Sequence, residues 1–136
     1  MGAIDRGNMP TTVDIEREFR ITLPTKHRAA LDDLDDRIHV STLMLKPEGL
    51  KLEDIFYVNA DLRNSWQGWN ERWLAFATNE CGDYFAYDLA SIPYRVVYID
   101  PIETVEESVS RCEAEGFVFP TFDAWYEYEL ATKPET

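Results

Sequence analysis

Residues 72–89 constrain the fold of this chain more than any other stretch. Two apolar segments, 73–77 and 84–89, flank a polar Asn-Glu-Cys-Gly sequence that ends at Gly82. Glycine adopts a positive φ without steric cost and asparagine favours turns, so the pattern predicts a β-hairpin. Side chains alternate between the two faces of a strand, and both faces of this hairpin carry aromatic residues. We therefore expect the hairpin in the middle of a sheet that is covered at least partly on both sides.

The rest of the chain predicts helices and two further strands around this hairpin. Apolar spacing and capping patterns predict helices that begin near residue 11 and span 24–34, 52–62 and 121–130, and a further helix start within 104–112. Apolar segments bounded by turn residues predict two more strands, over 41–45 and 95–100. A hairpin followed by a neighbouring strand gives an antiparallel sheet. The expected fold class is therefore α+β, with helices packed against an antiparallel sheet. A single domain is expected over 13–131, between a flexible arm (1–12) and a tail (132–136).

The composition indicates a cytoplasmic protein. At 136 residues the chain has the length of one ordinary domain. Its first ten residues lack the apolar segment of a secretory signal, and no apolar run approaches the roughly 20 residues of a membrane helix. Its two cysteines, Cys81 and Cys112, in a chain without a secretory signal are typical of a reducing compartment.

The chain is strongly acidic, and the acidity is concentrated toward its end. The net charge is −13, and residues 101–136 contain nine acids but only two bases. Such a surface repels phosphates and anionic lipids, so neither nucleic acid nor a membrane is expected as a partner. The charge would attract a basic protein and speed its association, but it is also compatible with a role in solubility alone.

Few residues of the chain suggest catalytic or metal chemistry. The two histidines, His27 and His39, have no cysteine nearby at metal-ligand spacing, and His27 fits the apolar stripe of a helix. Phosphate-binding, dinucleotide-binding and nucleophile-elbow motifs are absent from the sequence. A carboxylate pair such as Asp83 with Asp88 can always be nominated among 26 acids. We expect no catalytic residue, no metal and no cofactor.

Three groups of residues are candidates for contacting a protein partner. They are the aspartates after the second helix, two loop tryptophans and three glutamates near a helix start: Asp32, Asp33, Asp35, Asp36, Trp66, Trp69, Glu103, Glu106 and Glu107. Aspartates at a helix C-terminus oppose the helix dipole, which is sometimes a sign of function, although a solvated face is the simpler reading. Loop tryptophans are either contact residues or pegs that close the edge of the core, and we favour pegs.

The hairpin and the two ends of the chain also resemble a known family. Its members have a helix leading into Leu-Pro, then a strand, a polar turn, Gly-Asp, and an aromatic strand ending in Asp-Leu. The matching positions here, the signature residues, are Leu23, Pro24, Phe76, Ala77, Gly82, Asp83, Tyr84, Phe85, Asp88 and Leu89. Segment 119–130 is similar to the family's final helix. On these motifs the chain resembles the Smi1/Knr4 (SUKH) superfamily.

This resemblance implies an α+β domain that binds proteins rather than catalysing a reaction. Bacterial members are mostly immunity proteins that neutralise polymorphic toxins, often nucleases, and fungal members regulate cell-wall synthesis through protein partners. Many members carry an Asn-Gly-Gly stretch after the second helix, where this chain has Asp35 and Asp36, so the subfamily stays open.

Three hypotheses for function follow. The leading one is a toxin-neutralising protein that acts by occlusion of a basic toxin domain, because carboxylates can occupy positions where phosphates would bind. The second is a regulatory scaffold with a cellular partner, and genome neighbourhood would separate it from the first. The third, an enzyme with a carboxylate pair, would lose turnover when Asp83 and Asp88 are replaced by asparagine.

Overall fold

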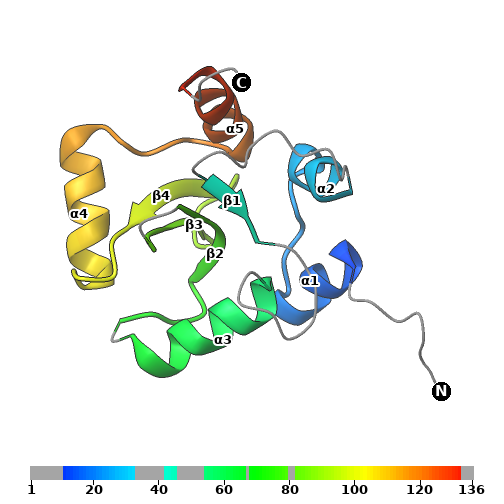
Figure 1. Ribbon diagram of the computed structural model, residues 1–136, viewed down its shortest axis with the longest axis horizontal. Coiled ribbons are helices and arrows are strands. Elements are labelled where there is room, and N and C mark those ends of the chain that lie inside the picture. Colours follow the sequence, from blue (N-terminus) through cyan, green and yellow to red (C-terminus); the bar gives the residue numbers. More distant parts are fainter. Residues whose placement is uncertain (1–10, 33–41, 46–53, 67, 80–81, 133–136) are drawn as a thin grey trace.

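A four-stranded antiparallel sheet forms the centre of the molecule. The computed structural model describes residues 11–32, 42–45, 54–66, 68–79 and 82–132. Its elements in chain order are α1 (Thr12–Phe19), α2 (Thr25–Asp32), β1 (Thr42–Met44), α3 (Ile55–Ser65), β2 (Trp73–Asn79), β3 (Tyr84–Asp88), β4 (Arg95–Ile99), α4 (Val105–Glu115) and α5 (Phe122–Thr132). The strand order is β1-β2-β3-β4 (Figure 1), so the hairpin β2–β3 occupies the two middle positions. The α+β prediction and the central place of the hairpin are confirmed.

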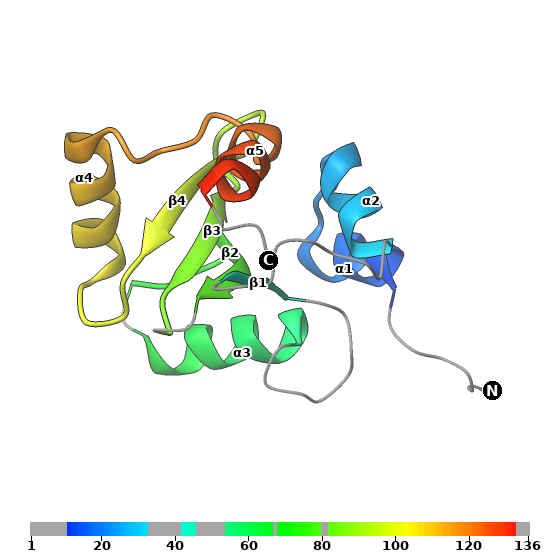
Figure 2. The same ribbon diagram turned by 45° about the horizontal axis from the view of Figure 1, so that its top comes forward.

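Helices surround this sheet on all sides. Figures 1 and 2 show α4 on one side of it, α1 and α2 on the other, and α3 and α5 at opposite ends of the view. The closest packing joins α4 to β4, α3 to β2, and α2 to α5. Among the helices of the described ranges, none is long and apolar enough to span a bilayer.

One face of the sheet is covered by a cluster of aromatic rings. Phe76 of β2 stacks on Tyr87 of β3 with 4.4 Å between ring centroids, and Trp125 of α5 meets Phe76 edge-on at 4.9 Å. His27 of α2 stacks on Phe122 at 4.6 Å, and its Nδ1 lies 2.6 Å from the Tyr87 hydroxyl oxygen. Burial lowers the pKa of His27 to about 3, so the ring is neutral at pH 7. His27 is therefore a core residue, further inside than the core edge that the sequence predicts.

Capping residues set the helix ends that the sequence predicts. The Thr11 N–H donates to the Asp14 carboxylate at 2.7 Å, which fixes the start of α1. At α4 the Thr104 N–H donates to Glu107 at 2.9 Å, and the Glu107 N–H donates to the Thr104 hydroxyl at 3.1 Å. Gly116 ends α4 with a φ of 72°, a left-handed conformation that glycine adopts without strain. The segment 104–112 is thus confirmed as a helix start.

Helix α3 begins three residues later than the sequence predicts. Asp54 is its N-cap, and the Asp54 carboxylate accepts the Tyr57 N–H at 2.8 Å. The predicted start was at residue 52, which lies outside the described residues. The apolar spacing favoured that position, whereas the capping aspartate determines where the backbone becomes helical.

Asn59 of α3 continues the edge of the sheet where β1 ends. β1 pairs with β2 from Thr42 opposite Asn79 to Met44 opposite Ala77. Further along β2, the Asn59 side chain accepts the Ala75 N–H at 2.8 Å and donates to the Ala75 carbonyl at 2.9 Å. The buried Asn59 amide therefore takes the place of the next edge-strand residue and fastens α3 to the sheet.

Candidate functional site

Most of the predicted acidic cluster after α2 lies outside the described residues. Asp33, Asp35 and Asp36 belong to the segment 33–41, which the structure does not describe. Asp32 is the last residue of α2. Cys81, which follows β2 in the sequence, also lies outside the described residues. The partner-binding role of these aspartates stays a prediction.

The other two predicted groups lie together at one end of the molecule. Trp66 and Trp69 stack with 5.5 Å between ring centroids and 11° between ring planes. The Trp66 Nε1–H donates to the Glu103 carbonyl at 3.1 Å, which ties the connection between α3 and β2 to the segment before α4. Trp69 is only 5% exposed, and Trp66 is half-buried. Trp69 is thus a core peg, and its ring has little surface left for a partner.

Glu103 is held by intramolecular bonds. Its carboxylate accepts hydrogen bonds from Arg111 Nη2 at 2.7 Å and Nε at 3.0 Å, and from the Ser108 hydroxyl at 2.8 Å. These bonds, that from Arg111 first, lower the pKa of Glu103. A partner would have to compete with Arg111 for this carboxylate.

Glu106 and Glu107 are both exposed and form no salt bridge with a described residue, but only the Glu106 carboxylate is also without a capping bond. Glu107, by contrast, caps α4. Gly68 allows the close approach of Glu106, since a Cβ on Gly68 would lie 3.1 Å from Glu106 Oε1. Glu106 borders a shallow depression of about 200 Å³ lined by Asn70, Arg72, Trp73, Glu106, Val109 and Ser110. The Arg72 guanidinium lies 4.7 Å from the centre of the Trp73 ring, so Val109 is the apolar side chain left beside the Glu106 carboxylate. A carboxylate next to an aliphatic side chain suits the head and stem of a lysine or arginine.

An ion cluster built on the buried carboxylate of Asp88 adjoins this depression through Arg72. Asp88 at the end of β3 accepts hydrogen bonds from Arg72 at 2.8 and 3.0 Å and from Arg95 at 2.8 Å. Arg95 also reaches Glu113 of α4 at 2.9 Å. Burial acts to raise the pKa of Asp88, but the two arginines and the Ala90 N–H outweigh it and lower the pKa to about 2. The cluster joins the hairpin to β4 and α4.

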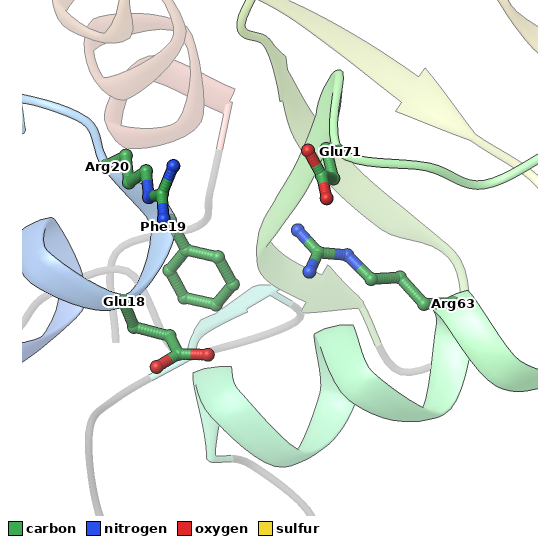
Figure 3. Close-up of a pocket in the computed structure, with 5 residues that line it drawn as sticks. All are labelled: Glu18, Phe19, Arg20, Arg63 and Glu71. Carbon is green, nitrogen blue, oxygen red and sulfur yellow. The ribbon is translucent and has the colours of Figure 1, made fainter.

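A second pocket, the Phe19 pocket, lies between α1, α3 and the start of β2 (Figure 3). Its volume is about 320 Å³, and it is lined by Glu18, Phe19, Arg20, Arg63 and Glu71. Phe19 stacks on Phe56 at 5.8 Å, and the Arg63 guanidinium lies 5.7 Å from the centre of the Phe19 ring. The sequence does not predict this pocket, because its residues match no motif and those of α1 lie more than 40 positions before the others.

Possible metal ligands do not converge in the described part of the chain, where no group of three or more His, Cys, Asp or Glu side chains is placed to bind an ion.

Comparison with known families identifies the chain. A model of the SMI1 / KNR4 family (SUKH-1) matches residues 11–128, which is most of the 136-residue sequence. The chain belongs to the SMI1/KNR4 (SUKH-1) family. The resemblance seen in the sequence is confirmed, and the match to SUKH-1 answers the question of subfamily. Searches of curated proteins and of solved structures found no match.

The signature residues of this SUKH-1 domain shape its hairpin. Gly82 takes a φ of 87°, a conformation that other residues adopt only with strain. The Asn79 side chain accepts the Asp83 N–H at 3.0 Å, and the Asp83 carboxylate accepts a hydrogen bond from the Tyr98 hydroxyl of β4. Burial, together with the bond to Asp83, raises the pKa of Tyr98 to about 12. Leu23 and Phe85 are buried, and Pro24, Tyr84 and Leu89 are half-buried.

Proposed function

We propose that this SUKH-1 domain is an immunity-type protein that binds and occludes a basic toxin domain in the cytoplasm, without catalysis or a cofactor. Family membership supports a role in protein–protein interaction in general. The observation that carries the more specific proposal is Glu106, an exposed carboxylate without a salt bridge to a described residue, at the edge of a depression that fits one cationic side chain.

The charges around the depression favour a cationic ligand. The whole chain has a net charge of −13, which steers a basic protein toward it and raises the association rate. Arg72 also lines the depression, but its charge is balanced by two hydrogen bonds to Asp88. Glu106 therefore remains the acid that can pair with the partner, while Val109 contacts the aliphatic stem of the incoming side chain.

The test is binding to the toxin domain encoded directly beside this gene. Calorimetry at low and high salt should show an affinity that falls as salt rises, because the attraction is between opposite charges. Glu106→Gln should weaken binding about tenfold, which corresponds to about 1.4 kcal/mol. Glu127→Gln, an exposed acid on α5, is the matched control and should leave affinity unchanged.

Two results would contradict the proposal. If the adjacent gene product does not bind, the regulatory scaffold with a cellular partner becomes the better hypothesis. If binding is equally tight at high salt and in Glu106→Gln, occlusion can persist but the role of Glu106 fails.

A further inference from the structure

The arginines of the described segments fall into two groups. Five of the seven form salt bridges within the chain: Arg17, Arg28, Arg72, Arg95 and Arg111. Arg20 and Arg63 form none with a described residue, and both line the Phe19 pocket. In an acidic chain a carboxylate partner is easy to supply, so two arginines left unpaired in one place indicate a site for an anion from outside the chain.

The pocket holds these guanidinium groups around an aromatic ring. Figure 3 shows Arg20 and Arg63 on opposite sides of the Phe19 ring, with the Glu71 carboxylate pointing toward the Arg63 guanidinium and Glu18 below the ring. These four charged residues form no salt bridge with one another or with other described residues. The volume of about 320 Å³ is at the lower end for a ligand site and suits one side chain rather than a large molecule.

The backbone of Arg20 is strained, which supports a role for this residue beyond ending a helix. Arg20 has φ 58° and ψ 50°, a left-handed conformation that costs a residue with a Cβ about 1 kcal/mol or more. Glycine would end α1 without this cost. The conformation is held by the Arg20 N–H and the Ile21 N–H, which both donate to the Glu16 carbonyl. Such strain is common where a side chain is positioned for a ligand.

We propose that the Phe19 pocket binds one aspartate or glutamate side chain of the protein partner, with its carboxylate bonded to Arg20 and Arg63 beside the Phe19 ring. This inference rests on the proposed role in protein binding. It adds to the contact at Glu106 a second contact in which the charges of domain and partner are reversed. Guanidinium groups bind carboxylates through paired, charge-assisted hydrogen bonds. Phe19, which stacks on Phe56, gives the pocket one apolar side against which the stem of the acidic side chain can pack.

The two pockets lie on either side of one connection. Glu71 lines the Phe19 pocket, whereas its sequence neighbours Asn70 and Arg72 line the depression beside Glu106. A single partner that presents a basic residue to Glu106 and an acidic one to Arg63 can therefore contact both. Opposite charges in adjacent pockets fix the orientation of the partner and select against surfaces that are uniformly basic.

The test uses a peptide probe instead of a toxin, so its outcome is independent of the toxin's identity. NMR of the protein labelled with ¹⁵N-arginine monitors the Nε–H signals of Arg20 and Arg63 during titration with blocked Gly-Glu-Glu-Gly or Gly-Lys-Lys-Gly peptide. A single carboxylate contact predicts saturable shifts of both signals with a dissociation constant of about 1–10 mM for the glutamate peptide only. No saturation at about 50 mM, or binding of the lysine peptide instead, would overturn the proposal.

Variants decide which side chains carry the binding. Arg63→Gln and Arg20→Gln should each abolish saturation, whereas Arg17→Gln, an exposed arginine of α1 paired with Asp14, should retain it. Glu71→Gln should bind the glutamate peptide at least as tightly as wild type, because it removes a like charge from the rim. Retained binding in Arg63→Gln, or weaker binding in Glu71→Gln, would show that the pocket does not hold a carboxylate.

Discussion

Two pairs of arginines in this SUKH-1 domain are used in different ways. Arg72 and Arg95 enclose Asp88, a carboxylate whose side chain is 2% exposed, and the three groups join β2, β3 and β4. Arg20 and Arg63 surround Phe19, and no described carboxylate lies within salt-bridge distance of either. The first pair stabilises the fold, whereas the second leaves its hydrogen-bonding capacity available at the surface.

The difference shows that arginine content alone says little about function. What separates the two pairs is whether the chain itself supplies the acid. A buried carboxylate needs its cations, because an uncompensated charge in the interior is strongly destabilising. Exposed guanidinium groups remain solvated, so leaving them unpaired costs little folding free energy, and they stay available to pair with an acid of the proposed partner.

The largest effect is expected from removing the acid of the first pair. Asp88→Asn should destabilise the domain by about 2–3 kcal/mol at pH 7, because a neutral amide cannot replace the charge-assisted bonds that the buried Asp88 carboxylate accepts from Arg72 and Arg95. Urea unfolding followed by tryptophan fluorescence measures this. Asp83→Asn, a nearby acid of the same hairpin, is the comparison, and an equal loss there would mean that Asp88 is not special.

The contribution of ionised Asp88 should also be visible in how the stability of the domain depends on pH. The pKa of Asp88 is lowered from 3.8 to about 2, so its contribution is present above pH 4 and is lost as pH falls toward 2. The shift corresponds to about 2 kcal/mol. This part of the pH dependence should be absent from Asp88→Asn.

The pH dependence of wild type must be compared with that of Asp88→Asn, because His27 also makes stability depend on pH. The unfolded chain protonates His27 below about pH 6.5, but the buried ring resists protonation until about pH 3. Wild type and variant therefore both lose stability as pH falls through this range, by up to about 1.4 kcal/mol per unit. Only the difference between the two proteins isolates Asp88, and parallel curves between pH 4 and 2 would contradict its predicted role.

Single arginine replacements should separate the two pairs by a smaller margin. Arg95→Gln removes bonds to Asp88 and Glu113 and should cost about 1.5 kcal/mol. Arg63→Gln should change stability by less than about 0.5 kcal/mol, since it breaks no salt bridge to a described residue. Thermal unfolding of both variants tests this. A large loss of stability in Arg63→Gln would show that Arg63 stabilises the fold, as Arg95 does.

The last effect, a difference between two variants at one position, concerns the strained backbone at Arg20. Arg20→Gly should be about 1 kcal/mol more stable than Arg20→Ala, because glycine accepts the left-handed conformation and alanine does not. Both variants lack the guanidinium, so both should lose binding of the glutamate peptide. Equal stability of the two would mean that the conformation is not strained in solution.

The sequence predicts the fold well where local chemistry determines it. The hairpin follows from alternating aromatic residues around Gly82, and the starts of α1 and α4 follow from the Thr11–Asp14 and Thr104–Glu107 capping pairs. The bonds between Asn59 and the sheet, by contrast, depend on where α3 docks.

The candidate sites were less predictable because they depend on tertiary packing. Trp66 and Glu103, which are 37 positions apart, are joined only by the fold. The sequence favours Trp69 as a core peg, as observed, but it does not show that Glu106 is exposed without a salt bridge while Glu103 is paired with Arg111. The Phe19 pocket needs the docking of α1 against α3. Asp88 was recognised as a signature position, but its arginine partners were not.

The docking of Asn59 on Ala75 has a consequence for how this protein meets others. Open strand edges are where separate chains add strands to one another and begin to polymerise. With the Ala75 peptide group already satisfied by a side-chain amide, that stretch of β2 cannot template a foreign strand. A partner that binds at this end of the domain would therefore contact side chains, through their charge and shape, rather than add a strand to the sheet.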